Sequence, residues 1–203
     1  MTSPASDFAA CAVEWARLAR GGRLRSPREH IGAALAFADG SRSVIFRETA
    51  RVDPPAAEPV LLVIAFRLAM LGSVRPLHAA FRRECVLHVP LFAGFPGFRS
   101  KLWLDDVDTG VYRGVYEWGD RELADAYAHR MVALLAPFST AGTARFHLVP
   151  ELPRDRFLTD PEAAPGGAED AWWRLAEPQS STDGGAANYG PEYGVRSGWN
   201  AVR

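Results

Sequence analysis

Four aromatic side chains fall on two neighbouring predicted strands and could form the wall of a binding site. They are Trp103 in the first strand and Tyr112, Tyr116 and Trp118 in the second. Because side chains alternate between the faces of a strand, the last three share one face, with Gly114 between them. A glycine inside a strand often permits close approach of a ligand or of another backbone. For any single ring, ordinary core or dimer packing is the favoured explanation, but a shared face would let a flat aromatic ligand stack on several of them.

Two ionisable residues could supply acid–base chemistry beside such a wall. His78 lies next to the apolar stripe of a predicted helix, close to Phe81 and Cys85, where it could abstract a phenolic proton or stabilise an enolate. Arg67 interrupts an otherwise apolar strand, so its charge must be paired, exposed at an edge, or directed into a cavity. A histidine satisfied in the core or at the surface and a structural arginine are the competing explanations. We take His78 as the candidate base, Arg67 as its electrostatic partner, and Phe81 as part of the pocket lining.

Other kinds of chemistry lack their usual sequence signals. Four histidines have no tight ligand spacing, so no metal site is predicted: His78, His88, His129 and His147. Glycine-rich nucleotide motifs, a GxSxG elbow and a catalytic-cysteine motif are missing, so we expect no cofactor. Two cysteines, Cys11 and Cys85, do not make a disulfide framework.

The overall charge and hydropathy argue against nucleic acid and membranes as partners. The formal net charge is −1, so no global field draws the chain to nucleic acid or to an anionic membrane. No run reaches the roughly 18 apolar residues of a membrane helix, and the first twenty residues do not read as a signal peptide, so we expect a cytoplasmic protein. Among 23 basic residues Lys101 is the only lysine, a bias that a GC-rich genome explains.

Three zones position these residues. The first, 1–58, predicts a helix over 7–20, stopped by two glycines, and then a hairpin around Asp39 and Gly40. Consecutive prolines in 53–59 make that run a linker. The third zone, 153–203, is rich in Gly, Pro, Ala, Asp and Ser and predicts a mostly irregular tail, whose aromatic residues could dock on a pocket mouth or on a partner subunit.

The middle zone, 59–152, carries the core. Its pattern is strand, helix, strand, strand, helix, strand, which is the split βαβ order of ferredoxin-like α+β domains. The strands are expected at 60–70, 98–106, 111–119 and 143–152, and the helices at 74–88 and 120–135. Both crossover helices must lie on one face of the sheet. The other face would then be apolar and uncovered, which predicts face-to-face pairing of two copies in a C2 homodimer.

The middle zone also resembles a known family. The residues that carry the resemblance are Pro96-Gly97-Phe98, Trp103, the run from Tyr116 to Asp120, and Ala126-Tyr127. The stretch 95–131 is similar to the middle of the antibiotic-biosynthesis-monooxygenase superfamily of dimeric α+β barrels, and most of all to its YdhR-like members. Many members have a histidine where Tyr127 falls. His129 is two residues away, about 200° around a helix, and cannot take over that place.

The resemblance implies a pocket between the sheet and its helices, with Tyr127 as part of the lining. Members of the superfamily include cofactor-free oxygenases of polycyclic phenols, haem-degrading proteins, isomerases and polyketide cyclases, so the fold does not fix the reaction. Our leading hypothesis is a cofactor-independent monooxygenase of secondary metabolism, such as antibiotic biosynthesis, acting on a polyphenolic or polyketide-like substrate. The alternatives are a cyclase or isomerase that uses the same pocket, and a non-catalytic accessory protein that binds a partner enzyme.

Overall fold

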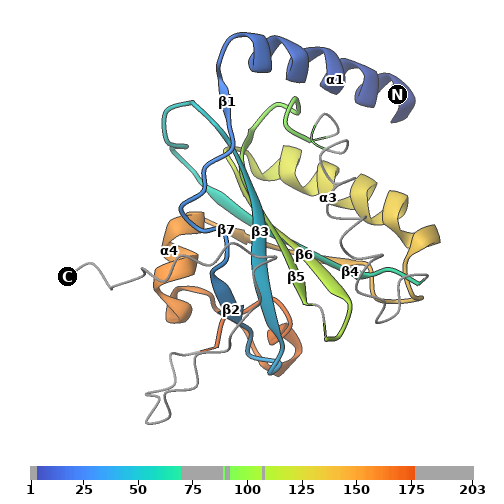
Figure 1. The fold of residues 1–203 in the computed structure, drawn as a ribbon, viewed down its shortest axis with the longest axis vertical. Coiled ribbons are helices and arrows are strands. Elements are labelled where there is room, and N and C mark those ends of the chain that lie inside the picture. The colour runs from blue at the N-terminus through green and yellow to red at the C-terminus, as the bar shows by residue number, and fades with distance from the viewer. Residues whose placement is uncertain (1–3, 70–88, 90–91, 107, 177–203) are drawn as a thin grey trace.

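One antiparallel sheet organises the molecule (Figure 1). A computed structural model describes residues 4–69, 89, 92–106 and 108–176. The strands are β1 (Leu24–Arg25), β2 (Ala34–Ala36), β3 (Arg42–Arg51), β4 (Val60–Arg67), β5 (Phe98–Asp106), β6 (Val111–Trp118) and β7 (Arg145–Pro150). The helices are α1 (Pro4–Arg20), α3 (Arg121–Leu135) and α4 (Arg154–Thr159), with single turns η2 (Ala136–Phe138), η3 (Pro161–Ala163) and η4 (Ala168–Asp170).

The strand order confirms the ferredoxin-like α+β arrangement. The order across the sheet is β1-β3-β5-β6-β4-β7, and β2 also pairs with β3. Strands β4, β5, β6 and β7 therefore form the four strands of the split βαβ pattern, with β7 at the edge of the sheet, and α3 connects β6 to β7. The side chain of Asp120 caps α3 by accepting a hydrogen bond from the backbone N–H of Leu123 (2.9 Å). The helix expected at 74–88 lies outside the described residues.

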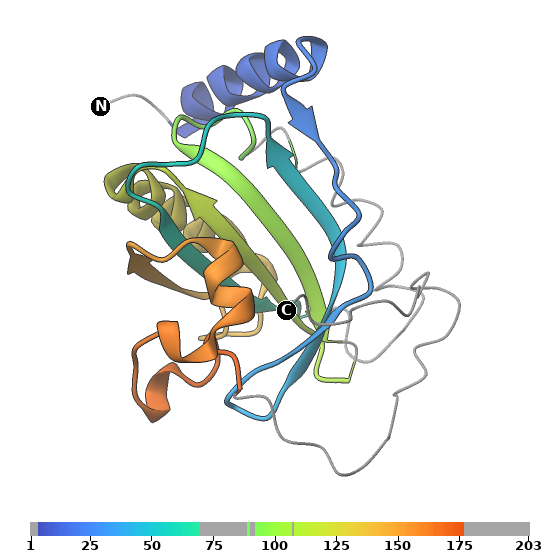
Figure 2. The same cartoon turned by 90° about the vertical axis from the view of Figure 1, so that its left-hand side faces the viewer.

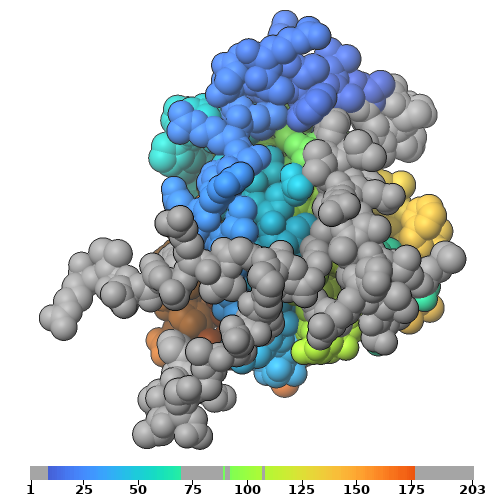
Figure 3. All heavy atoms as spheres, viewed as in Figure 1, coloured from blue at the N-terminus to red at the C-terminus, as the bar shows by residue number. Residues whose placement is uncertain are grey.

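The N-terminal zone extends this sheet. Strands β2 and β3 form the predicted hairpin, with Ala36 opposite Arg42. Strand β3 then pairs with β5, so that Thr49 lies opposite Lys101 and Arg47 opposite Trp103. Helix α1 begins at Pro4 and not at the predicted Asp7, and it crosses one end of the molecule (Figure 3). None of the described helices is both long and apolar enough to span a membrane.

One side of the sheet faces α1 and α3, and we call it the helix face. Val60, Leu62 and Ile64 of β4 are buried there. The turn before β5 closes against α1, because a Cβ on Gly94 would lie only 1.9 Å from the carbonyl oxygen of Cys11. Glycine is thus needed where this turn meets the helix backbone.

The other side, which we call the second face, is covered by the chain's own C-terminal segment 152–176 (Figure 2). The sheet contributes the buried side chains Leu61, Val63, Ala65, Leu102, Leu104 and Val115. The segment contributes Leu152, Phe157, Ala164, Trp172, Trp173 and Leu175, each less than a tenth exposed. Fully burying a large apolar side chain contributes roughly 1.5–3 kcal/mol, so these contacts hold the segment firmly.

The described part of the C-terminal zone is docked on the sheet. The prediction was a mostly irregular tail over 153–203 whose aromatic residues could dock. Residues 154–176 contain α4 and two helical turns and bury Trp172 and Trp173 against the sheet, while 177–203 lie outside the described residues. The expected face-to-face homodimer used the same surface, which the chain itself covers.

Candidate functional site

The aromatic wall lies on the helix face, as strand alternation predicts. Lys101 is opposite Tyr116, Trp103 is opposite Gly114, and Asp105 is opposite Tyr112, so these side chains share one side of the sheet. Four aromatic residues are buried with at most 7% exposure: Trp103, Tyr112, Tyr116 and Trp118. The wall therefore sits between β5, β6 and the helices.

Gly114 serves a different purpose from the one expected. A Cβ at this position would lie 2.6 Å from Cε2 of Tyr116, which is on the same strand. The space above the glycine is thus filled by the tyrosine ring of the chain itself and is not left for a ligand. The missing side chain allows Tyr116 to lie flat along the strand.

Lys101 lies at the centre of the wall, surrounded by aromatic rings. Its Nζ is 3.1 Å from the ring centroid of Trp103, 4.6 Å from that of Phe92 and 4.7 Å from that of Tyr116. The residue is only 6% exposed, although lysine is rarely buried in proteins. The negative faces of the rings stabilise the ammonium group by cation–π attraction. The wall thus carries a buried positive charge.

Two tyrosine hydroxyls meet beside this lysine. The hydroxyl of Tyr127, on α3, donates to that of Tyr116, on β6, over 3.4 Å. The ring of Tyr127 also packs 4.9 Å from Trp118 and 5.5 Å from Phe95, measured between centroids. Burial, reinforced by the neighbouring Tyr116, raises the pKa of Tyr127 well above its ordinary value. Tyr127 therefore remains a neutral hydrogen-bond donor at physiological pH.

Two indole groups of the wall have unused hydrogen-bonding capacity. The Nε1 atoms of Trp103 and Trp118 are buried and have no hydrogen-bond partner among the described residues. Buried donors in native proteins are nearly always paired with protein, water or ligand. These N–H groups are therefore available to an acceptor from outside the chain.

Of the two predicted catalytic residues, the structure describes only Arg67, and it is not at the wall. Arg67 is exposed at the end of β4, where its backbone N–H and carbonyl bond to Thr143 and Thr140. By alternation along β4 its side chain is on the side of Leu61 and Val63, the second face. Of the three alternatives for this charge, Arg67 is thus exposed at the end of its strand, and it is not the cation of the pocket. His78 and Phe81 lie outside the described residues, as does His88.

The other residues singled out from the sequence have separate places. Tyr112 stacks on Phe66, with centroids 5.6 Å apart, at the end of the wall remote from Tyr127. His129 is exposed on α3, 3.3 Å from Asp125. His147 lies on the second face and stacks on Trp173, with centroids 4.2 Å apart. Burial lowers the pKa of His147, and nearby Asp170 only partly offsets this.

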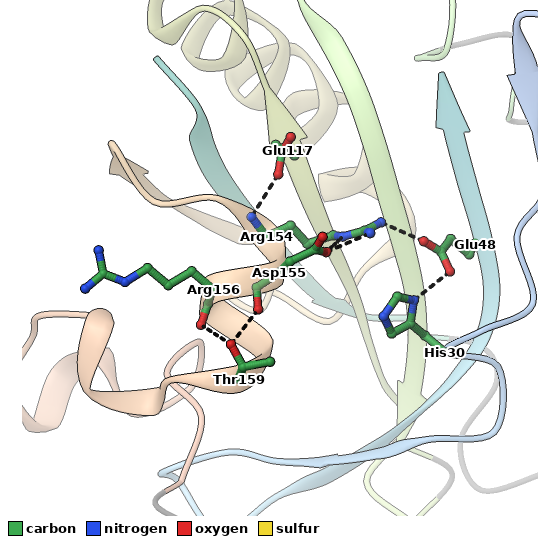
Figure 4. Close-up of polar contacts among 7 residues, drawn as sticks. All are labelled: His30, Glu48, Glu117, Arg154, Asp155, Arg156 and Thr159. Carbon is green, nitrogen blue, oxygen red and sulfur yellow. Dashed lines mark hydrogen bonds and ion pairs between the residues drawn. The ribbon is translucent and has the colours of Figure 1, made fainter. Parts of the chain in front are cut away.

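The second face holds a buried polar cluster that sequence reasoning missed (Figure 4). Glu48, on β3, is 2% exposed and contacts His30 Nδ1 (2.8 Å) and Arg154 Nη1 (2.7 Å). The backbone N–H of Arg154 also donates to Glu117 Oε2 (2.9 Å). Burial raises the pKa of Glu48, but the hydrogen bond from His30 and the charge of Arg154 outweigh this and hold its pKa below the ordinary value. These contacts join N-terminal zone, sheet and C-terminal segment.

A second anchor on that face is Arg113. Its guanidinium donates to the hydroxyls of Ser41 (2.7 Å) and Ser43 (2.8 Å) and to the carbonyl of Trp172 (3.2 Å). It also lies over the ring of Phe37, 4.1 Å from the centroid. Arg113 thus clamps the β2–β3 hairpin to the C-terminal segment, and it is structural. In the described part of the chain, no group of three or more His, Cys, Asp or Glu side chains could hold a metal ion.

Comparisons with known proteins found similarity only to solved structures. No protein-family model matches the chain, and neither does any curated protein. Among solved structures, it is similar to a ferredoxin-fold protein related to antibiotic biosynthesis monooxygenases from Listeria monocytogenes (10% identity over 56% of this chain and 66% of that one, TM-score 0.39). It is also similar to a monooxygenase-like protein from Listeria innocua (12% identity over 57% of this chain and 66% of that one, TM-score 0.37).

A third similar structure is the heme-degrading enzyme of Listeria monocytogenes (11% identity over 64% of this chain and 97% of that one, TM-score 0.33). The chain spans just under two thirds of the length of the first two proteins. At such identities the similarity extends to the fold alone. The first two of these neighbours are monooxygenase-like proteins, which is the kind that the sequence resemblance indicated.

Proposed function

We propose that this chain is a cofactor-independent, monooxygenase-like enzyme that holds a flat phenolic or polyketide-like substrate on the helix face. The observation that supports it is the buried ammonium of Lys101 within a group of three aromatic rings. The aromatic rings favour stacking of a planar ligand, and the positive charge of Lys101 stabilises the anionic form of that ligand. Lys101 thus takes the electrostatic role that the sequence assigned to Arg67.

The chemistry follows from charge placed at the reacting centre. Removal of a proton gives a phenolate or enolate whose negative charge lies close to Lys101, which stabilises it in a site with little water. Such an electron-rich carbanion can pass an electron to O2 directly. Oxidation of a ring CH2 to C=O by one O2, with release of one water, requires no further reductant. The role of base stays with His78 as a prediction.

The tyrosine pair would orient the substrate oxygen. Tyr127 is neutral and donates to Tyr116, so the pair can rearrange to donate to an oxyanion placed next to it. The free indole N–H groups of Trp103 and Trp118 supply further donors on the same face. Together they favour an oxygen-rich aromatic substrate over a hydrocarbon.

Ligand binding and oxygen uptake test the proposal. Naphthols and anthrones would be titrated by calorimetry into wild type, Lys101→Met and Lys101→Arg, with exposed Arg121→Met on α3 as the charge-removal control. We expect phenol binding to weaken about tenfold or more in Lys101→Met, since a charge-assisted hydrogen bond contributes about 1.5–3 kcal/mol. Lys101→Arg and Arg121→Met should bind nearly as wild type does.

Turnover would be followed with an oxygen electrode and product analysis. One O2 consumed per product supports the oxygenase. Equal product formation under anaerobic conditions would reject oxygenation and favour the cyclase or isomerase alternative. Wild-type turnover in Lys101→Met would reject Lys101 as the cation of the site.

A further inference from the structure

Arg47 on β3 faces the aromatic wall from the N-terminal zone. The register of β3 against β5 shifts between Ile45 and Arg47, so that Ile45 is opposite Leu104 and Arg47 is opposite Trp103. Phe46, the extra residue, packs against the helix-face core, 6.3 Å from Trp103 between ring centroids. Such bulges re-aim side chains, and this one gives the helix face both Phe46 and Arg47.

The guanidinium of Arg47 differs from those of its neighbours in lacking an ion pair. Its Nε is buried and has no hydrogen-bond partner among the described residues, as is also true of Arg51 Nε, Arg99 Nε and Trp103 Nε1. Two neighbouring arginines are paired: Arg51 and Arg99 form ion pairs with Asp53 at 2.6 and 3.4 Å. Arg47 forms no ion pair in the described part of the chain. A buried charged donor without an acceptor is costly to keep.

Arg47 also adds a second positive charge to the wall. Lys101 and Trp103 are two residues apart on β5 and share a face, and their partners across the ladder are Thr49 and Arg47. Same-face positions on one strand are about 7 Å apart. Arg47 and Lys101 therefore occupy diagonal positions on the same face of the two paired strands. Their charges are close enough to hold two anionic groups of one small aromatic molecule.

We propose that the substrate of this site is a hydroxyarene carboxylate, whose carboxylate is bound by Arg47 and the indole N–H of Trp103 and whose phenolic oxygen lies near Lys101. The inference rests on the proposed function and specifies its substrate class. A guanidinium edge presents Nε and Nη donors in parallel, which match the two oxygens of a carboxylate. The free indole N–H of Trp103 adds a third donor.

A pair of probes that differ only in the carboxylate tests the inference. 3-Hydroxy-2-naphthoate and 2-naphthol would be titrated calorimetrically into wild type, Arg47→Gln and Arg42→Gln. Arg42 is an exposed arginine on the same strand and serves as the matched control. We expect wild type and Arg42→Gln to bind the naphthoate about 30-fold more tightly than the naphthol. This ratio corresponds to about 2 kcal/mol, since a factor of ten in affinity is 1.4 kcal/mol. In Arg47→Gln that preference should vanish, with the naphthol affinity unchanged.

The outcomes separate this inference from the proposed function. Equal affinities for the two probes in wild type, or a preference retained in Arg47→Gln, would overturn the carboxylate site and leave the aromatic site standing. If neither probe bound, the aromatic site itself would be contradicted, and this inference with it. Should Arg47→Gln not fold by circular dichroism, Arg47→Lys keeps the charge, lacks the parallel donors, and should lose most of the preference.

Discussion

The contact between Arg154 and Glu48 joins the C-terminal segment to the sheet, and its removal should weaken the whole fold. Arg154 begins α4, and its side chain is 11% exposed, while that of Glu48 is 2% exposed. Arg154→Met would leave the Glu48 carboxylate buried, with His30 as its remaining partner among the described residues. Breaking a buried pair from one side costs 3–5 kcal/mol, because a charge is left without compensation.

The expected loss lies at the lower end of that range. Arg154 also contacts Asp155, which is 77% exposed and contributes little, and His30 still bonds to Glu48 after the change. We therefore expect Arg154→Met to lower the free energy of unfolding by about 3 kcal/mol. The double variant Glu48→Met/Arg154→Met should cost about 2 kcal/mol less than the sum of the single variants.

Urea unfolding followed by circular dichroism measures these differences, with Arg156→Met as control. Arg156 is two residues from Arg154 in the same helix, is 61% exposed, and among the described residues pairs with Asp160 at 3.6 Å. Its change should therefore stay within about 0.5 kcal/mol. A loss below about 0.5 kcal/mol in Arg154→Met, or additive single costs in the double variant, would refute the idea that this buried pair secures the segment.

The same carboxylate gives the pair a pH dependence. Its pKa in the folded state lies below the ordinary value of 4.5, so the unfolded chain binds the proton more readily. The stabilisation is therefore complete above pH 4.5 and is lost as the pH falls through the folded pKa. Between about pH 5 and pH 3, wild type should lose more stability than Glu48→Met. Parallel losses in the two proteins would contradict a depressed pKa at Glu48.

Two substitutions and one labelling experiment probe the packing on the two faces of the sheet. Gly114→Ala should cost about 1–3 kcal/mol in urea unfolding, because the new Cβ would lie 2.6 Å from the ring of Tyr116; a neutral result would contradict the close fit. Phe157→Ala, at a fully buried position, should cost about 3–5 kcal/mol and should speed proteolytic cleavage of 152–176, and unchanged cleavage would argue against a docked segment. Burial raises the pKa of Cys11 to about 11, so in a Cys85→Ser background a thiol reagent should label it slowly at neutral pH until urea unfolds the chain; rapid labelling of the folded protein would be inconsistent with that environment.

Local signals were sufficient to predict the core strands. The alternation in 98–106 gave the bounds of β5, and Asp120 marked the start of α3, because both depend on residues close in sequence. The first core strand ends at Arg67 and not at the predicted Met70. Its apolar run continues past the point where pairing with β6 stops, and hydropathy alone does not show that end.

Long-range contacts were beyond such reasoning. Glu48 and Arg154 are 106 residues apart in sequence, and nothing local marks them as partners. Lys101 did have a local signal, since it is the only lysine and shares its strand face with Trp103. Arg67 attracted attention as a charge in an apolar run, but a charge at the end of a strand reaches water at little cost, whereas one in the middle of a strand must find compensation.

Both faces of the sheet are apolar and must be covered, and they are covered by different elements. A ferredoxin-like sheet has helices on one side only, so its other side must be covered by something. The sequence predicted a second copy there, whereas the structure places 152–176 there, held by apolar contacts and by the buried pair of Arg154 and Glu48. Those two coverings compete for one surface. A homodimer that used this face would first have to release the segment, expose Phe157 and Trp173, and leave the charge of Glu48 without Arg154. The homodimer itself stays a prediction.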